Sequence, residues 1–511
     1  MNQVRYPELI LFFFILLAFY FPLPLAPLFD LDEGAFSEAT REMIATRDYI
    51  TTHLNGGLRF DKPILIYWLQ MFSVKLFGLN EFALRLPSAL AATAWAYIIY
   101  YFTQNFYSRN TAFFAALFMV ASLQVNLIAK AAIADALLNL FIVLSMFYMY
   151  RYYLTQSSKY LYYTFLFIGL GTLTKGPVAI MIPLVVSFLF YAFKKDLKAW
   201  MKAVFNPVGI LIFVLVALPW YIAEYMAQGE AFIDGFFLKH NLSRFSNAME
   251  SHSGSIFYFI PVLIVGMMPF TYLVIKALKK AKLYFKEEFR LFLFIWFIFV
   301  FAFFSLSGTK LPHYVIYGYT PLFILAAVIV ENEHIKKGWL LIPLLILLGI
   351  LLFLPDIALM LKASIQDKLA VVLIEQSLDT FDFTYRASIV TMIILTLAIY
   401  AIKFQKHYVL MGVAVVMIVT VNYIVIPTYG KLMQQPIKEA AHLAKQKDLK
   451  NIIMYKINTP SFNVYYEDLV RKIKPKIGDI VFTKVTKLKD FKTYEILYRK
   501  NGFVLLKVES L

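Results

Sequence analysis

Three carboxylates stand together near the start of this chain, at the point where a long apolar stretch ends. Asp30, Asp32 and Glu33 lie in FDLDEGAFSEATREM (residues 29–43), directly after ELILFFFILLAFYFPLPLAPLF (residues 8–29). Carboxylates act as general bases in enzymes, and they also accept hydrogen bonds at helix N-termini. Acids at such a boundary are candidates for catalysis, and we take Asp32 and Glu33 as the stronger two.

Other ionisable side chains occur in short motifs further along the chain. They are Asp61 and Lys62 in RFDKP, Lys130 and Asp135 in AKAAIADALLN, His240, Arg244 and His252 in KHNLSRFSNAMESH, and Lys310, His313 and Tyr314 in GTKLPHY. Lys and Arg suit a phosphate group, and a Tyr hydroxyl can donate to the same oxygens. Asp61 with His240 or His252 could share a divalent cation, although no spacing here is diagnostic of a metal.

Each of these residues also has a plain structural explanation. Asp30 could cap a helix, Lys62 could extend along an apolar surface to reach water, and Asp135 could bond a neighbouring helix. His313 could be an interfacial histidine, and Lys175 in TLTKGPVA could belong to a tight turn. The chemical interpretation depends on whether the residues meet on one side of the molecule.

The composition indicates an integral membrane protein. The 511 residues are 61% hydrophobic and 16% charged, and the mean hydropathy is +0.68. There is no cysteine, which excludes a disulfide framework and a thiolate metal site. About half of the net charge of +17 lies in residues 427–511, where 17 Lys or Arg face 8 Asp or Glu. A basic excess beside a membrane favours anionic lipids over nucleic acid as the partner.

Apolar windows long enough to cross a bilayer predict about 13 transmembrane helices. They are residues 8–29, 82–103, 110–128, 132–150, 160–175, 177–193, 205–224, 255–275, 291–307, 313–330, 338–355, 386–402 and 408–426. The first is predicted to be an uncleaved span, because no small-residue cleavage site precedes Asp30. Lys and Arg gather in alternate loops, which marks those loops as cytoplasmic.

The opposite loops are therefore predicted to be external, and the candidate residues lie in or beside them. These loops are residues 30–81, 129–131, 225–254, 308–312 and 356–385. In the first, EGAFSEATREMIATRD has an apolar helical face and is predicted to lie flat on the bilayer, with Asp30 or Asp32 at its N-terminus. Pro63 is predicted to open a second amphipathic helix, PILIYWLQMFSVKLFG.

The chain is predicted to divide into a transmembrane domain, residues 1–430, and a small external α/β domain, residues 431–511. In the second domain PIKEAAHLAKQKD is predicted to be a helix, and NIIMYKI and DIVFTKV are predicted strands. YEILYRKNGFVLLKV is predicted to form a hairpin that turns at Asn501-Gly502.

The same motifs resemble a known family. DEGAFSEATREMIATRDYITTHLNGGLRFDKPILIYWL is similar to the first external loop of the GT-C glycosyltransferases, in the group of the lipid A aminoarabinose transferases and bacterial protein mannosyltransferase-like enzymes. The resemblance continues through AIADALLNLF, LTKGPVA, KHNLSRF and GTKLPHYVIYGYTPL, and it covers most of residues 8–330.

The resemblance implies a fold of 13 spans with an active site on the periplasmic side of a bacterial inner membrane. It implies a sugar donor on a polyprenyl (undecaprenyl) phosphate, such as 4-amino-4-deoxy-L-arabinose, and an acceptor such as lipid A. By this similarity Asp32 is the leading catalytic carboxylate and Asp135 the second, while Lys62, Arg244 and Tyr314 hold the donor phosphate. Lys310 joins the phosphate-binding candidates from its motif.

The resemblance also implies a metal-binding pair, made by Asp61 with His240 or His252. The ion would be zinc, magnesium or manganese. Asp61 stands where the family often has Glu, so the side chain is shorter here. We further expect a monomer in contact with membrane lipids and no nucleic acid partner.

The predicted reaction is one direct displacement at the anomeric carbon, with inversion. A protein O-mannosyltransferase-like enzyme is an alternative from the same class. A flippase or transporter for lipid-linked sugars is an alternative from another class, but it would distribute ionisable groups through the bilayer. A polymer ligase or a sensor would give the basic C-terminal segment more importance.

Overall fold

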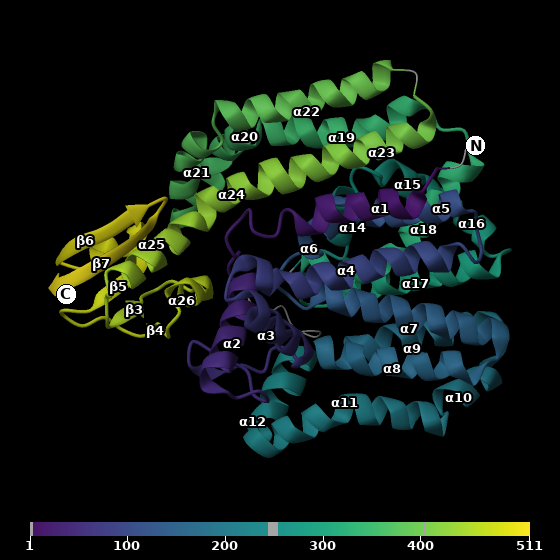
Figure 1. The fold of residues 1–511 in the computed structure, drawn as a ribbon, viewed down its shortest axis with the longest axis horizontal. Helices are drawn as coiled ribbons and strands as arrows, with labels where there is room; N and C mark the ends of the chain where they lie inside the picture. Colours follow the sequence, from purple (N-terminus) through teal and green to yellow (C-terminus); the bar gives the residue numbers. More distant parts are fainter. Residues whose placement is uncertain (1–3, 244–253, 403, 511) are drawn as a thin grey trace.

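Long helices that run side by side make up most of the molecule (Figure 1). The computed structural model describes residues 4–243, 254–402 and 404–510. Within these ranges seven helical segments are long and apolar enough to cross a membrane. They are α4 (Glu81–Thr103), α7 (Asp135–Thr155), α11 (Pro207–Gln228), α17 (Glu288–Leu306), η3 with α18 (Pro312–Gly318, Tyr319–Asn332), α22 (Phe383–Ala401), and the run of α23 (Lys406–Val419), η5 (Thr420–Val425) and α24 (Ile426–Met433).

Shorter or broken apolar helices lie beside these segments. They are α1 (Pro7–Ile15) with η1 (Leu16–Tyr20), α5 (Arg109–Ala121) with α6 (Leu123–Ile128), α8 (Ser158–Lys175), α9 (Val178–Phe193), α14 (Phe259–Gly266) with α15 (Thr271–Lys279), and α19 (Lys337–Leu352), which meets α20 (Leu354–Leu361) at a bend of 59°. Each apolar window of the sequence coincides with one helix or one such pair. The number of crossings, about 13, remains a prediction.

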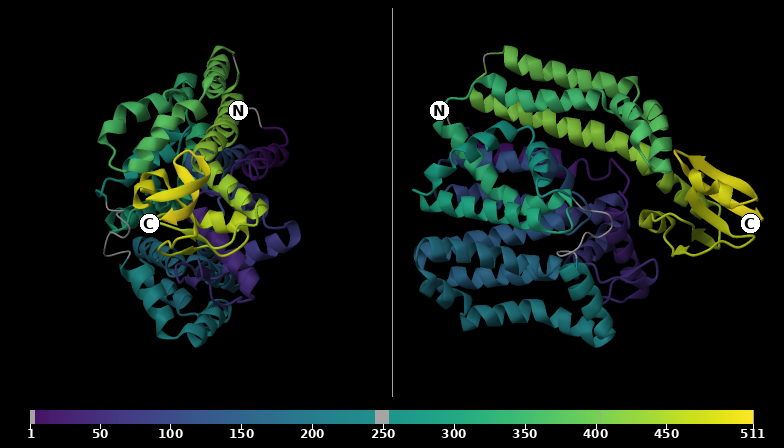
Figure 2. Two further views of the ribbon diagram at one scale, coloured as in Figure 1. Left: turned by 90° about the vertical axis from the view of Figure 1, so that its left-hand side faces the viewer. Right: turned by 180° about the vertical axis from the view of Figure 1, so that it is seen from behind.

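Short helices connect the long ones. They are α10 (Leu197–Val204), α12 (Glu230–Phe232), the π-helical segment η2 (Ile233–Ser243), α16 (Ala281–Tyr284), η4 (Lys362–Ser364) and α21 (Lys368–Thr380). Several helices lie outside the main bundle: α19, α22 and α23 form a separate layer along one side of it (Figure 2).

The first helix is shorter than its apolar window predicts. The window runs to residue 29, but the helix ends at Tyr20. Pro22, Pro24 and Pro27 follow, and proline offers no backbone N–H and is a poor helix former. The chain from Phe21 onward is therefore irregular, and it leads directly to the acidic cluster.

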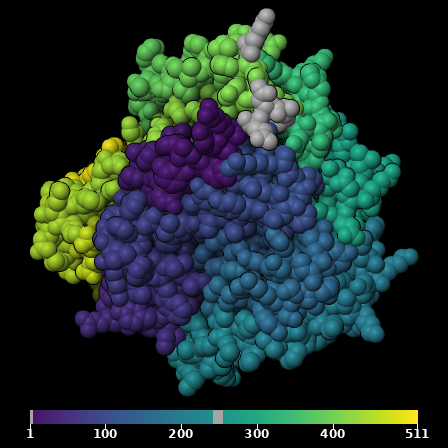
Figure 3. Space-filling view, turned by 45° about the vertical axis from the view of Figure 1, so that its right-hand side comes forward, coloured from purple at the N-terminus to yellow at the C-terminus, as the bar shows by residue number. Residues whose placement is uncertain are grey.

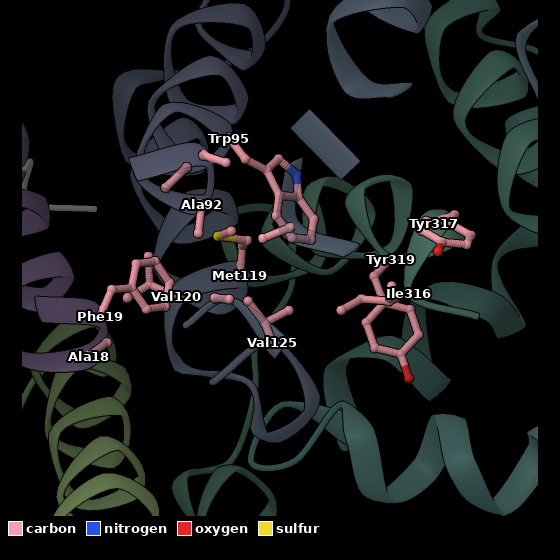
Figure 4. Close-up of a cluster of buried hydrophobic side chains, with 14 of the residues drawn as sticks. Ala18, Phe19, Ala92, Trp95, Met119, Val120, Val125, Ile316, Tyr317 and Tyr319 are labelled. Carbon is pink, nitrogen blue, oxygen red and sulfur yellow. The ribbon is translucent and has the colours of Figure 1, made fainter. Parts of the chain in front are cut away.

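The interior of the bundle is apolar and its outside is apolar as well. Trp95 and its neighbours from α4, α5 and η1 fill the centre (Figure 4), and the Trp95 indole donates to the Thr320 hydroxyl at 2.8 Å. On the outer face of α11, Leu215 and Met226 are 64% and 81% exposed. An exposed apolar surface of this extent is stable in lipid and not in water. The chain is thus a multi-pass membrane protein.

The segment after the first helix carries two helices, as predicted, but the first is enclosed. It holds α2 (Asp32–Thr46), the hairpin β1 (His53–Leu54) and β2 (Gly57–Leu58), and α3 (Leu65–Phe77). Every residue of α2 from Glu33 to Met43 is buried. The prediction that this helix lies flat on the bilayer is therefore wrong, because protein covers it on several sides.

Two local predictions for this segment are confirmed in part: Asp32 is the first residue of α2, and a second helix follows Pro63. Leu31 holds the N-cap position of α2, and no side chain caps the helix. The acids of the cluster are instead used in tertiary contacts. The second helix starts at Leu65, two residues after Pro63.

The C-terminal segment forms a five-stranded sheet with helices packed on it. Its elements are α25 (Gln435–Gln446), β3 (Ile452–Met454), α26 (Pro460–Tyr466), β4 (Arg471–Lys472), β5 (Ile480–Lys484), η6 (Val485–Asp490), β6 (Thr493–Lys500) and β7 (Phe503–Ser510), with strand order β4-β3-β5-β7-β6. The predicted helix and strands are present, and β6 and β7 turn at Asn501-Gly502, both with positive φ. Helix α26 and strand β4 did not follow from the sequence. This sheet lies beyond one end of the bundle (Figure 1).

Candidate active site

Five parts of the chain surround one small cavity at the end of the bundle nearest the sheet, and predicted site residues line it. This cavity of about 40 Å³, called here the bridging cavity, lies among α2, the chain before α3, the start of α7, the end of α8, and η3. Its lining is Asp32, Phe36, Asp61, Lys62, Ile133, Asp135, Lys175, Leu311, His313 and Tyr314. Asp32 and Asp135, the two carboxylates implied by the resemblance, thus line the same space.

Asp135 is held by a cation and a phenol. It is the first residue of α7 and is almost completely buried. Its Oδ1 accepts hydrogen bonds from Lys175 Nζ at 2.7 Å and from the Tyr317 hydroxyl at 2.6 Å. Lys175 also donates to the Tyr317 oxygen at 2.8 Å, and His313 Nε2 lies 3.9 Å from the same Asp135 oxygen. A buried carboxylate with a directly bonded lysine stays ionised at neutral pH.

A second charged group forms around Asp61, in the chain just before α3. Lys62 Nζ donates to Asp61 Oδ1 at 2.8 Å, and Arg59 donates to Oδ2 at 3.1 Å. The ring nitrogen Nδ1 of His240, on η2, lies 3.3 Å from Asp61 Oδ1. Two cations around one carboxylate leave a net positive charge at this wall of the cavity, which favours an anionic ligand.

Two larger cavities adjoin the bridging cavity. One, of about 490 Å³, is called here the η2–η3 cavity and shares Asp61, Lys62, Lys175 and Tyr314 with the bridging cavity. The rest of its lining is mostly apolar: Pro177, Val178, Met181, Phe237, His240, Phe303, Phe304, Ser307 and Tyr317. An apolar space with cations at one end suits a lipid that carries an anionic head group.

The other large cavity, of about 460 Å³, is called here the α24 cavity and shares Asp32 and Ile133 with the bridging cavity. It is lined by residues of the irregular chain before α2, by the chain between α6 and α7, and by α24. Its polar residues are Asp30, Glu33, Arg85 and Lys130, among apolar ones such as Phe29, Leu127 and Ile426. The side chain of Asp32 is exposed and stands between two spaces built from different helices.

Glu33, a predicted catalytic residue, does not line the bridging cavity. Its two oxygens accept hydrogen bonds from Arg85 at 2.7 and 2.8 Å and from the backbone N–H groups of Phe29 and Ala132 at 3.0 and 2.8 Å. Arg85 uses its remaining N–H groups on the carbonyls of residues 23, 26 and 27. Burial opposes the charge of Glu33, but Arg85 lowers its pKa overall. This geometry fits an anchor for the start of α2 and leaves no oxygen lone pair directed at the bridging cavity.

Asp30 is directed away from the bridging cavity, toward the C-terminal sheet. Its Oδ1 accepts a hydrogen bond from the backbone N–H of Ser461 at 3.1 Å, and its Oδ2 is bonded to the Ser461 hydroxyl. Burial raises the pKa of Asp30 to about 7. The three acids that open the sequence therefore all border the α24 cavity, but Asp30 and Glu33 are bonded to other parts of the chain, and of the three only Asp32 also lines the bridging cavity.

Of the remaining predicted residues, Lys310 does not line this cavity. Lys310 is buried and donates to the carbonyl of Ser307 at 2.6 Å, and it lines neither the bridging nor the η2–η3 cavity. Arg244 and His252 lie outside the described residues. Their predicted roles at the phosphate and the metal remain predictions.

Around Asp61 the described residues supply two potential metal ligands, and the candidate His252 lies outside the described part of the chain. Among the residues that the structure describes, no three His, Asp or Glu side chains come together as metal ligands. Asp61 and His240 supply one oxygen and one nitrogen, and Lys62 already donates to the same Asp61 oxygen. Catalytic zinc sites normally have three protein ligands, so we derive no chemical step through a metal.

Sequence reasoning gave too little weight to Lys175, Tyr317 and Arg85. The motif TLTKGPVA allows Lys175 to be a turn residue, but a lysine at the external end of a span, between apolar segments, is also a signal of a functional contact. Tyr317 lies in the stretch GTKLPHYVIYGYTPL, three residues after Tyr314, and Arg85 is a cation inside a predicted span, which is a signal of the same kind.

Parts of the chain are similar in sequence to known proteins. Residues 61–222 match the family model described as dolichyl-phosphate-mannose-protein mannosyltransferase. The chain is 33% identical to the undecaprenyl phosphate-alpha-4-amino-4-deoxy-L-arabinose arabinosyl transferase of Aeromonas hydrophila, over 63% of this chain and 58% of that protein. It is also 30% identical to a protein of Aquifex aeolicus whose name states no function, over 62% of this chain and 72% of that protein.

The same fold occurs in solved structures. ArnT from Cupriavidus metallidurans, bound to undecaprenyl phosphate, superposes with a TM-score of 0.82 at 20% identity, over 98% of this chain and 97% of that one. The archaeal oligosaccharyltransferase AglB from Archaeoglobus fulgidus gives a TM-score of 0.52 at 10% identity, over 98% and 74% of the two chains.

The aligned part of the Aeromonas protein is a little over half of its length, whereas the likeness to the ArnT structure extends over the whole of both chains. The chain belongs to one family with the Aquifex protein, is similar to the undecaprenyl phosphate aminoarabinose transferases over a little more than half of their length, and has the fold of the ArnT structure.

Proposed function

We propose that the protein is an inverting glycosyltransferase of the periplasmic side of a bacterial inner membrane. It takes a sugar, such as 4-amino-4-deoxy-L-arabinose, from a polyprenyl phosphate and transfers it to an acceptor such as lipid A. The single observation that carries the proposal is the position of Asp32, between an apolar cavity with cations at its end and a second large cavity.

The η2–η3 cavity is the place for the donor. Its apolar walls suit a polyprenyl chain, and Lys62, Lys175 and Tyr314 lie where the cavity meets the bridging cavity. A phosphate at that position would gain charge-assisted hydrogen bonds from the two lysines. The sugar, joined to the phosphate, would then extend into the bridging cavity, toward Asp32 and Asp135.

The reaction is a direct displacement at the anomeric carbon. The bond from that carbon to the phosphate oxygen breaks, and its electron pair leaves with the polyprenyl phosphate. Lysine charges would stabilise the negative charge that develops there, an effect of several kcal/mol in favourable sites. An acceptor oxygen from the side of the α24 cavity forms the new bond, so the configuration is inverted.

Asp32 acts on the acceptor. If the acceptor is a hydroxyl, Asp32 accepts its proton, which contributes a factor of about 10² to 10⁴ in rate. If the acceptor is a phosphate, its oxygen is already ionised, and Asp32 orients the acceptor without accepting a proton. Asp135, bonded by Lys175, is placed to accept hydrogen bonds from the sugar hydroxyls.

A mannosyl donor is the second candidate, because the matched family model is that of a protein mannosyltransferase and covers Asp61, Lys62, Asp135 and Lys175. A flippase is less consistent with the structure, because the ionisable groups described above gather at one end of the bundle. A divalent ion between Asp61 and His240 would add positive charge near the donor phosphate, and it stays a proposal.

The test is an assay of the purified protein with undecaprenyl phosphate sugars and with lipid A, peptide and glycan acceptors. We expect transfer by the wild type and a loss of at least 100-fold in Asp32→Asn, with Glu495→Gln on exposed β6 as the matched acidic control. Full activity of Asp32→Asn, or no transfer from any donor by the wild type, would overturn the proposal. Retention of configuration would exclude the direct displacement.

A further inference from the structure

The C-terminal domain contacts the transmembrane part at the helix that carries Asp32. Helix α26 packs against α2, and its residues Pro460 to Tyr465 are buried. Figure 1 shows α26 facing α2, and in Figure 3 the C-terminal domain lies directly against the N-terminal segment. The two helices are more than 400 residues apart in the chain, so the contact forms only when both ends of the chain are folded.

Every second residue of α26 makes a polar contact with this region. Ser461 bonds Asp30 with its backbone N–H at 3.1 Å and with its hydroxyl. Asn463 Nδ2 donates to Glu38 Oε1 at 3.2 Å, and the Tyr465 hydroxyl accepts from the backbone N–H of Leu28 at 2.7 Å.

These contacts are made by residues on both sides of Asp32 in the sequence. Leu28 and Asp30 precede it, and Glu38 follows it on α2. On the membrane side, Glu33 is fixed by Arg85 at 2.7 Å. Asp32 itself is exposed, and the backbone on both sides of it is held by the contacts of its neighbours.

The packing at this point leaves no spare room. A Cβ atom at Gly34 would lie 1.8 Å from Asp30 Oδ1 and 2.9 Å from the backbone nitrogen of Ser461. Real Cβ contacts are longer than either distance, so only glycine lets the Asp30 carboxylate and Ser461 approach α2 this closely. The contact is thus a close fit of three residues, Asp30, Gly34 and Ser461, and not a loose surface pairing.

We propose that the C-terminal domain is a positioning part of the active site, in which Ser461 holds Asp30 against Gly34 so that Asp32 faces the bridging cavity. Ser461 and Asp30 are positioning residues and do not touch the substrate. The expected loss of kcat rests on the proposed function. The expected loosening of residues 29–46 does not.

The structural test uses hydrogen exchange on the full-length protein in detergent or nanodiscs. Gly34→Ala displaces Asp30 without removing a polar group, and Ser461→Ala removes the hydroxyl. We expect faster exchange in residues 29–46 in both variants, with unchanged exchange in α7 and α17. Gly57→Ala is the matched control, because the nearest atom to its added Cβ is 3.7 Å away. Wild-type exchange in residues 29–46 of both variants would overturn the proposal.

The catalytic test separates kcat from binding. A displacement of Asp32 by about 1 Å can lower the rate by about 10²-fold. We expect Gly34→Ala and Ser461→Ala to lower kcat by at least 10-fold while the Kd for undecaprenyl phosphate stays unchanged, because Lys62, Lys175 and Tyr314 lie on other elements. Ser461→Thr, which keeps a hydroxyl, restores part of kcat, and Ser461→Val does not.

The two tests distinguish failure of this inference from failure of the proposed function. If the wild type transfers no sugar but residues 29–46 loosen in the variants, the proposed function fails and the positioning contact stands. If the wild type transfers sugar and the variants lose only thermal stability, with kcat per folded molecule unchanged, the contact is a packing contact alone and the inference is wrong.

Discussion

Lys175 and Asp135 form an ion pair of 2.7 Å at the wall of the bridging cavity, and Tyr317 donates to the same carboxylate oxygen. Lys175 also lines the η2–η3 cavity. The lysine can therefore serve a donor phosphate and orient Asp135 at once. We therefore expect that the effects of substituting Lys175 and Asp135 on kcat are not independent.

The first prediction concerns this pair. Asp135→Asn and Lys175→Met should each lower kcat by about 10²-fold, because each removes one charge from a shared electrostatic arrangement. The double variant should lose hardly more than either single one, since residues in direct contact are not additive. A double-mutant cycle in the transfer assay measures this. Losses that simply add would show that the two residues act separately.

The second prediction separates two neighbouring acids. Glu33→Gln should lower the free energy of unfolding by about 3–5 kcal/mol, because it leaves the buried Arg85 without its counter-charge. Asp32→Asn should leave stability nearly unchanged, since the Asp32 side chain is exposed. Thermal unfolding in detergent compares the two variants. A Glu33→Gln protein as stable as the wild type would contradict the assignment of Glu33 as an anchor.

The third prediction is a pH dependence at the contact between α2 and α26. Burial raises the pKa of Asp30 from 3.8 to about 7, with Glu33 adding to the rise, and burial raises the pKa of Glu38 from 4.5 to about 8, opposed by Arg41 on α2. Both acids bind a proton more tightly in the folded state. Their contribution to stability is therefore largest below pH 4 and is lost as the pH rises toward 8.

Hydrogen exchange of α26 between pH 5 and pH 8.5, corrected for the intrinsic rate, measures this dependence. We expect protection to fall as the pH rises. Asp30→Asn, which cannot ionise, should flatten the part of the curve up to about pH 7. If protection of α26 increased with pH, the predicted loss of stability on ionisation of Asp30 and Glu38 would be wrong.

The fourth prediction assigns the two large cavities. A bulky side chain in the η2–η3 cavity, Met181→Trp, should weaken binding of undecaprenyl phosphate at least 10-fold. Ile426→Trp in the α24 cavity should raise KM for the acceptor and leave donor binding unchanged, because the two residues line different cavities. Both variants add a bulky side chain, so each serves as the control for the general effect of overpacking on the protein. Loss of donor binding in Ile426→Trp would reverse the assignment.

The sequence predicted the helices, and which candidate residues would lie close together, better than it predicted the contacts of individual side chains. A membrane span needs an apolar segment of about 20 residues, and the charges of short loops indicate its orientation. Both signals lie within a short stretch of sequence, so spans can be predicted without knowing the tertiary structure. The role of Glu33 depends on Arg85 and that of Asp30 on Ser461, partners 52 and 431 residues away. The short motif DLDEGAF contains no pattern from which partners so far away in the sequence could be predicted.

The helix α2 shows the same limit. Its apolar face predicted a helix correctly, but the pattern could not tell contact with lipid from contact with protein. Its polar face is buried as well, because Asn463 and Arg41 satisfy Glu38, and Gln70 accepts the hydrogen bond of Thr40. Polar residues that are bonded to other parts of the chain can be buried at little cost.

The bridging cavity has a kinetic consequence. It shares lining residues with both large cavities, so donor and acceptor lipids can occupy the protein together, with Asp32 between them. On the proposed function, the reaction would then proceed through a ternary complex, with no sugar stored on the enzyme. Initial-rate plots at several fixed acceptor concentrations should intersect and not run parallel.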